Sequence, residues 1–160
     1  MTTTTGDRKR WIFVLVAMFG LAISAQAYAT PPLKAPFPCG DSYQVTQGHN
    51  TGSHVDKGAW AWDFGMNTGD VVAAPANGTV RMVRDDSTQY GCDSQYANDA
   101  NYVVVEFSDN TEALFLHLRA GSAQVSVGDQ VQAGDPLAEV GQSGWICGTH
   151  LHFQIQETCS

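Results

Sequence analysis

Short segments rich in Val, Leu and aromatic residues follow one another along the chain, and polar turn residues separate them. The segments with this pattern are 60–64, 101–107, 113–118 and 151–155. In the last of these, Leu151, Phe153 and Ile155 form one apolar face, because side chains two positions apart share a face of a strand. In 113–118, Leu114 and Leu116 share a face with Leu118. A period of two over such short lengths predicts β-strands.

Turn signals lie between these segments, and no stretch of a dozen residues shows helical periodicity. Examples are Asn77-Gly78, Gly128-Asp129 and Gly134-Asp135-Pro136. We therefore expect an all-β fold, a compact antiparallel β-sandwich or barrel-like single domain. The segment 85–100 is polar and predicts a long surface loop, which in a small domain is often functional.

The N-terminal segment 1–29 predicts a secretory signal peptide. A basic cluster at 8–10 precedes an apolar run at 12–23, and small residues follow it, so cleavage after Ala27 or Ala29 fits. A membrane-spanning helix needs about 20 apolar residues, and this run is shorter. We expect a mature domain at 30–160 that is periplasmic or secreted, without stable membrane insertion after processing, and monomeric.

Composition narrows the function classes. The 160 residues carry 8 Lys and Arg against 16 Asp and Glu, a net charge of −8, with 43% hydrophobic residues. The apolar content excludes a disordered acidic tail, and the acidic balance argues against a nucleic-acid partner. The cysteines are Cys39, Cys92, Cys147 and Cys159. In an exported chain their even number favours two disulfides, with three pairings open. A zinc site made of four thiolates is disfavoured, because the sequence contains no CxxC pair.

The candidate chemistry centres on histidine and one aspartate. His150 and His152 share one face of the last predicted strand, a geometry that can hold a metal, although Gln154 and Gln156 would also continue an exposed polar face. Asp63 lies in an aromatic strand, opposite Trp60, Trp62 and Phe64, which we expect in the core. A carboxylate in an apolar strand needs a partner or a metal unless it faces solvent.

The remaining histidines are His49, His54 and His117. His54 lies in a loop rich in Gly and Ser, and His117 ends an apolar strand on the face of Phe115, where a lone histidine is commonly a core residue. Taken together, the His and Asp residues suggest a zinc centre with three protein ligands and an open position. Further histidines could manage protons at such a centre.

In these residues and their order, the chain resembles the lysostaphin/LytM-type zinc endopeptidases, which cut peptide bonds in bacterial peptidoglycan. The matching stretches, spread over about residues 48–157, are 54–64, 69–80, 115–118, 127–137 and 141–153. The most specific of them is Gly148-Thr149-His150-Leu151-His152-Phe153. The resemblance implies that the zinc ligands are His54, Asp63 and His152, that the catalytic histidines are His117 and His150, and that the substrate is a peptidoglycan peptide.

The chain departs from the family pattern at a few positions. Nine residues separate His54 from Asp63, a longer spacing than is common in the family, so His49 stays a fallback ligand. Phe115 replaces a tyrosine, and Thr149 replaces a proline. Two alternatives remain: an inactive relative that binds the cell wall or activates other wall hydrolases, and a lipoyl-type carrier module. A carrier needs a lysine on its hairpin turn, and neither Lys34 nor Lys57 lies at such a turn.

Overall fold

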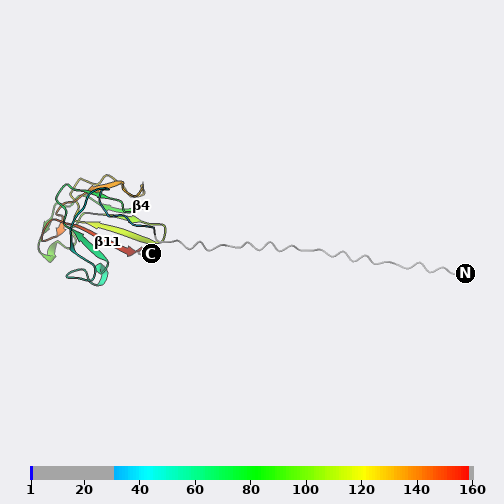
Figure 1. Cartoon of the computed structure of the whole chain (residues 1–160), viewed down its shortest axis with the longest axis horizontal. Coiled ribbons are helices and arrows are strands. Elements are labelled where there is room, and N and C mark those ends of the chain that lie inside the picture. Colours follow the sequence, from blue (N-terminus) through cyan, green and yellow to red (C-terminus); the bar gives the residue numbers. More distant parts are fainter. Residues whose placement is uncertain (2–30, 159–160) are drawn as a thin grey trace.

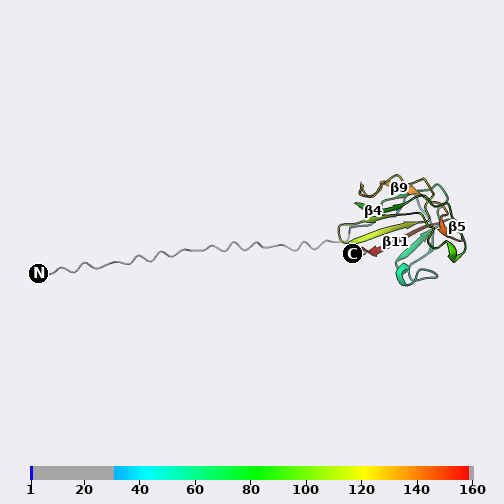
Figure 2. The ribbon, with the colours of Figure 1, turned by 180° about the vertical axis from the view of Figure 1, so that it is seen from behind.

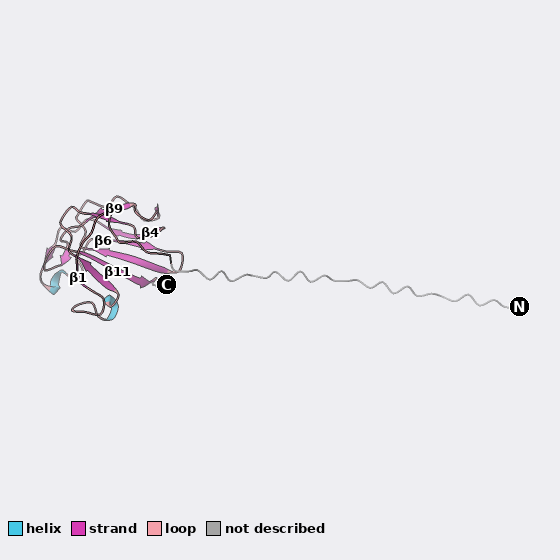
Figure 3. Cartoon of the chain, viewed as in Figure 1, coloured by secondary structure: helices cyan, strands magenta, loops and turns pink. Residues whose placement is uncertain are grey.

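Strands dominate the part of the chain that the computed structural model describes, Met1 and residues 31–158 (Figure 3). The principal sheet has seven strands, and each neighbouring pair is antiparallel. In spatial order they are β1 (Val45–Gln47), β2 (Ala61–Phe64), β11 (Leu151–Glu157), β7 (Thr111–Leu116), β6 (Tyr102–Glu106), β4 (Gly78–Arg84) and β8 (Gln130–Val131). The four segments predicted as strands are β2, β6, β7 and β11, so the antiparallel all-β prediction is confirmed.

A second sheet of two antiparallel strands, β3 (Val71–Ala73) and β9 (Pro136–Glu139), covers one face of the principal sheet. Val72 and Leu137 from this small sheet share one apolar cluster with Val103, Phe115 and Leu151 from the large one, and all five are fully buried. Figure 2 shows β9 and β4 on the same side of the domain. The core therefore lies between two layers, as in a sandwich.

Alternation along β7 differs from the predicted grouping of its leucines. Ala113 and Phe115 face the core, whereas Leu114 and Leu116 lie on the opposite face and are only partly buried. Leu118 does not share their face and is buried in the core instead. The reason is a break in the alternation at His117, whose φ of +67° turns the chain after the strand ends.

The aromatic residues of the predicted strand 60–64, which contains β2, are also more exposed than predicted. Phe64 packs against the core, but Trp60 is 63% exposed and Trp62 is 36% exposed. Both indoles lie against the ring of His49, with centroid distances of 5.8 Å and 4.9 Å. β2 is one strand from the edge of the sheet, so alternation there does not guarantee burial.

The predicted loop 85–100 lies beside the segment that precedes β11. It contains the short strand β5 (Tyr90–Gly91) and the 3₁₀ helix η2 (Ser94–Tyr96), and β5 pairs in parallel with β10 (Gly144–Trp145). A disulfide between Cys92 and Cys147 fastens the two segments together. Of the two predicted disulfides, this is the one in the described residues; Cys39 is exposed and unbridged there, and Cys159 falls outside them.

A second 3₁₀ helix, η1 (Asp56–Gly58), lies in the loop between β1 and β2. Figure 1 shows this loop projecting on the side of β11 that is remote from β4. Apart from Met1, the predicted signal peptide, 1–29, lies outside the described residues. Within the range 31–158, no helix is long and apolar enough to cross a membrane.

Candidate metal centre

Two of the predicted ligands, Asp63 and His152, lie side by side on neighbouring strands of the sheet. Strand β2 pairs with β11 in a register that sets Asp63 opposite His152. Side chains of such a pair lie on the same face, with Cβ atoms about 5 Å apart. The Nδ1 atom of His152 is 3.0 Å from the Oδ1 atom of Asp63. Strand pairing alone therefore brings these two groups together, on the face that the β3–β9 layer does not cover.

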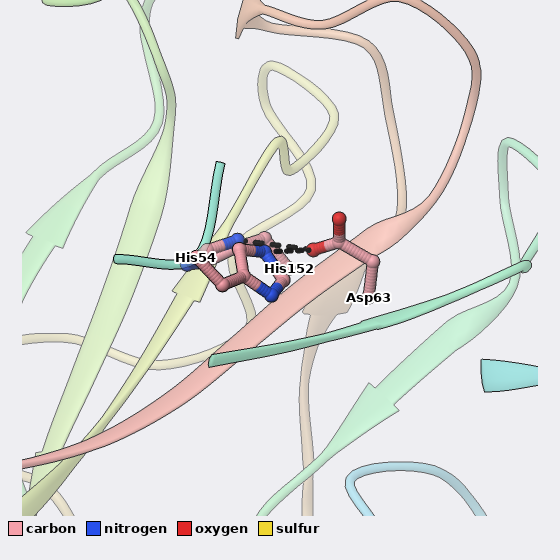
Figure 4. A group of neighbouring side chains, drawn as sticks. All are labelled: His54, Asp63 and His152. Atoms are coloured by element: carbon pink, nitrogen blue, oxygen red, sulfur yellow. Dashed lines mark hydrogen bonds and ion pairs between the residues drawn. The ribbon is translucent and has the colours of Figure 1, made fainter. Parts of the chain in front are cut away.

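The third predicted ligand, His54, comes from the loop between β1 and β2. Its side chain is buried, and its Nδ1 lies 3.1 Å from the carbonyl oxygen of Gly48, to which it donates. Its Nε2 atom lies 3.2 Å from Oδ1 of Asp63. Figure 4 shows the imidazoles of His54 and His152 turned toward this one carboxylate oxygen.

This group fits a zinc ion by the chemistry of its donors. His54, Asp63 and His152 each offer one ligand atom, and these atoms lie within 4.8 Å of one another. Two imidazole nitrogens and one carboxylate oxygen are a ligand set that catalytic zinc uses, with the fourth position left for water or substrate. The hydrogen bond from His54 to a backbone carbonyl also fixes the tautomer of a metal-binding imidazole.

The electrostatics of Asp63 favour an ionised carboxylate. Burial raises the pKa of this group, but the hydrogen bond from His152 and the nearby His150 and His54 outweigh burial and lower the pKa overall. The Nε2 atom of His150 is 3.6 Å from the same Oδ1 atom. A charged carboxylate surrounded by imidazole nitrogens suits a divalent cation.

The two remaining predicted site residues, His117 and His150, lie beside this cluster. Their ring centroids are 4.9 Å apart, and that of His117 is 6.1 Å from that of His152. Each has its Nδ1 on a backbone carbonyl at 2.8 Å, His117 on Ser143 and His150 on Gly148. In both, Nε2 is therefore the atom available to accept a proton.

His117 is buried and neutral at pH 7. Burial lowers the pKa of His117 to about 4, helped by the imidazoles of His150 and His152 and opposed by the carbonyl of Ser143. The prediction that His117 shares the core face of Phe115 is wrong. The positive φ at His117 directs the imidazole toward His150 instead of into the core.

A cleft of about 540 Å³ opens over the cluster. Its lining includes all five site residues together with Gln47, Ser53, Gly58, Ala97, Ala100, Leu116, Trp145, Ile146, Cys147 and Gln154. Trp145 is half exposed at this wall. The loop 85–100 contributes Ala97 and Ala100, whereas Tyr90, Tyr96 and Tyr102 are not among the lining residues.

The structure separates the two candidates for the first ligand. His54 lies in the cluster, whereas the fallback His49 stacks on Trp60 and Trp62. Sequence reasoning missed the carbonyls of Gly48, Ser143 and Gly148, which orient the imidazoles. Backbone acceptors leave no signal in the residue pattern, so only the folded chain identifies them.

An all-β domain with a His–Asp–His cluster and two further imidazoles in one cleft has the groups that metal-dependent hydrolysis uses. Comparison with known proteins specifies the class further. Residues 57–160 match the model of peptidase family M23, so the chain belongs to this family.

The names of two curated relatives describe enzymes that cut peptidoglycan or glycyl-glycine bonds. The chain is 30% identical over 93 residues to the peptidoglycan DD-endopeptidase ShyA of Vibrio cholerae, covering 58% of this chain and 19% of that protein. It is 32% identical over 107 residues to the glycyl-glycine endopeptidase ALE-1 of Staphylococcus capitis, covering 67% of this chain and 25% of the relative. The chain thus spans a quarter or less of the length of these relatives.

Solved structures share the fold. A zinc-containing peptidase from Vibrio cholerae superposes with a TM-score of 0.60 at 26% identity, over 79% of this chain and 37% of the other. Lysostaphin from Staphylococcus simulans superposes with a TM-score of 0.59 at 24% identity, over 82% of this chain and 49% of the other. The latter likeness concerns the fold alone.

Proposed function

We propose that this chain is an exported zinc endopeptidase that hydrolyses peptide bonds in the stem peptides or crossbridges of peptidoglycan. The observation that carries the proposal is the cluster of His54, Asp63 and His152 with two further imidazoles in the same cleft. Membership of family M23 and the names of the two curated relatives support it. Export through the segment 1–29 is part of the proposal.

In this proposal His54, Asp63 and His152 hold the metal. His54 would bind through Nε2, because its Nδ1 donates to Gly48. His152 would bind through Nδ1, the atom that faces Asp63. A zinc ion at this position supplies a Lewis acid for the scissile carbonyl and lowers the pKa of a bound water toward neutrality.

His117 and His150 manage the proton and the developing negative charge. With Nδ1 on a carbonyl, each presents its Nε2 to the cleft. One of them accepts the proton of the attacking water, and the protonated ring can return it to the leaving amine. The other stabilises the oxyanion of the tetrahedral intermediate when its own Nε2 carries a proton, so that the ring donates to the developing charge.

The cleft suits a peptide substrate. Its volume of about 540 Å³ falls within the range typical of ligand sites and exceeds what a single water would need. One wall carries the partly exposed indole of Trp145, and the disulfide Cys92–Cys147 holds that wall. A flat aromatic surface beside the metal ligands can orient an extended peptide across them.

Digestion of purified peptidoglycan by the mature domain tests the proposal. The released fragments are analysed by mass spectrometry, with and without a chelator. We expect new amino termini that disappear with the chelator and return with added zinc, and their sequence identifies the bond. Asp63→Ala should lose zinc and turnover together, whereas Asp129→Ala, at an exposed loop aspartate, should retain both.

The alternatives give different results in the same experiment. Bound zinc without release of fragments from any wall preparation would overturn the proposed activity and favour a relative that binds or activates other hydrolases. A protein that binds no zinc would contradict the metal centre itself. Full zinc content and turnover in Asp63→Ala would refute the assignment of that ligand.

A further inference from the structure

A buried polar network lies directly behind His117. Its two central side chains are Asn101, which is 0% exposed and precedes β6, and Ser143, which is 5% exposed and precedes β10. Neither residue belongs to the His–Asp–His cluster or the cleft lining. Buried amide and hydroxyl groups are costly unless every donor and acceptor finds a partner. Their partners therefore show what the network holds in place.

The Ser143 residue contacts His117 and both segments around it. Its carbonyl oxygen accepts the Nδ1–H of His117 at 2.8 Å. Its hydroxyl accepts the backbone N–H of Asn101 at 2.8 Å and donates to the carbonyl of Leu118 at 2.9 Å. One residue thus fixes the His117 ring and clamps the backbone immediately after it.

The Asn101 side chain completes the network. Its Oδ1 accepts the N–H of Ser87 at 2.8 Å, and its Nδ2 donates to the carbonyls of Ser87 at 2.9 Å and Leu118 at 3.2 Å. The backbone of Leu118 also donates to the Asn101 carbonyl at 3.3 Å. Asn101 therefore joins Ser87, near the start of the loop 85–100, to Leu118, the residue that follows His117.

The backbone of His117 needs this support. Its φ of +67° is uncommon for a residue other than glycine and costs on the order of 1–2 kcal/mol. Such a conformation persists only where the surroundings over-determine it. Without it, the alternation of β7 would send the imidazole to the core face, where Phe115 lies.

We propose that Asn101 and Ser143 are positioning residues for His117. They hold its backbone in the left-handed conformation and keep the proton on Nδ1, so that Nε2 faces the cleft with a free lone pair. The consequence for turnover rests on the proposed endopeptidase function. The consequence for the ring itself does not, because tautomer and orientation are properties of the folded chain.

The test compares two buried serines that make the same kinds of bond. Ser143→Ala removes the hydroxyl of the network. Ser122→Ala is the matched control, because the Ser122 hydroxyl is also buried, donates to the carbonyl of Arg119 at 2.7 Å and accepts the N–H of Glu139 at 3.1 Å. Two-bond ¹H–¹⁵N correlation spectra of the histidine rings report the tautomer of His117, in both the metal-free and the zinc-loaded full chain.

We expect a single Nδ1–H tautomer for His117 in the wild type and in Ser122→Ala, and a tautomer mixture in Ser143→Ala. Zinc content should be unchanged, and kcat on peptidoglycan should fall roughly 10–100-fold with KM little altered, as is typical when a supporting partner is lost. Ser143→Thr, which keeps the hydroxyl, should restore both readings. Ser143→Cys replaces the alanine variant if that variant does not fold.

The proposal is overturned if Ser143→Ala and Ser122→Ala lower the melting temperature alike and leave the His117 tautomer alike. A wild type that cuts no wall material refutes the endopeptidase function, yet the ring spectra still decide the role of the network. Loss of zinc in Ser143→Ala would also overturn the proposal that this residue positions His117, because the metal ligands would then depend on this serine.

Discussion

Exchanging the two candidate first ligands for alanine tests the metal centre most directly. His54 offers one of the three proposed ligand atoms, whereas His49 lies outside the cluster against two tryptophans. Structural zinc sites with four ligands bind with about 10–16 kcal/mol, or roughly 2.5–4 kcal/mol for each ligand. His54→Ala should therefore raise the Kd for zinc by about 10²–10³-fold, because each 1.4 kcal/mol is about tenfold. His49→Ala should leave that Kd within a few fold.

The assay is a competition titration against a chromophoric chelator at fixed pH, with metal content measured separately. Circular dichroism of each metal-free variant checks that the domain is folded. His49→Ala has an effect of its own, since losing the ring contacts with Trp60 and Trp62 should lower stability by about 0.5–1.5 kcal/mol. A folded His49→Ala that loses zinc, beside a His54→Ala that keeps it, would refute the assignment.

Three further predictions concern the scaffold, each measured by urea unfolding of the metal-free domain. Phe115→Ala removes a fully buried core ring and should cost about 3–5 kcal/mol; less than about 1 kcal/mol would contradict the two-layer core. Glu112 is 0% exposed, and its carboxylate lies 2.6 Å from Nη2 of Arg81. Arg81→Ala removes this countercharge and should lower the free energy of unfolding by about 3–5 kcal/mol. Adding Glu112→Gln should recover much of this loss, and no recovery would argue against the ion pair. Replacing Cys92 and Cys147 by serine opens a crosslink that spans 55 residues and should cost about 4 kcal/mol, whereas unchanged stability would contradict the bridge.

Most of the fold could be predicted because strand alternation and turn residues are local signals. Leu151, Phe153 and Ile155 form the predicted apolar face of β11, and Leu151 is fully buried. The same rule misplaced Trp60 and Trp62, which are exposed just before β2 and within it. Alternation assigns side chains to faces, but the extent of the covering layer decides burial, and that extent depends on residues far along the chain.

The candidate site was predicted less completely. Asp63 and His152 could be paired only by analogy, since the register of β2 against β11 is a long-range property. The direction of the His117 side chain could not be predicted from strand alternation, because a positive φ at a histidine breaks that rule and no neighbouring glycine or asparagine marks it. Polar contacts from Asn101 and Ser143 support that conformation, and both precede their strands by a single residue.

The β11 strand organises the site beyond supplying His152 and following directly on His150. His150, His152 and Gln154 follow one another at intervals of two, and all three line the cleft. The Nε2 of Gln154 donates to the carbonyl of Lys57 at 2.8 Å, in the loop that carries His54. The strand that presents one proposed ligand, His152, therefore also anchors the loop that presents another, His54. The hydrogen bond from His54 to the carbonyl of Gly48 ties the same loop to the residues at its start.

This arrangement divides the ligands by how firmly they are held. Asp63 and His152 are neighbours on paired strands, so the sheet fixes their separation even without a metal. His54 depends on its loop, which is anchored by the Gln154 contact and by a backbone bond from Asn50 to Ala59 at 3.0 Å. A long spacing before Asp63 is compatible with a formed site for this reason: the added residues form an anchored loop in which the position of the imidazole is set at both ends.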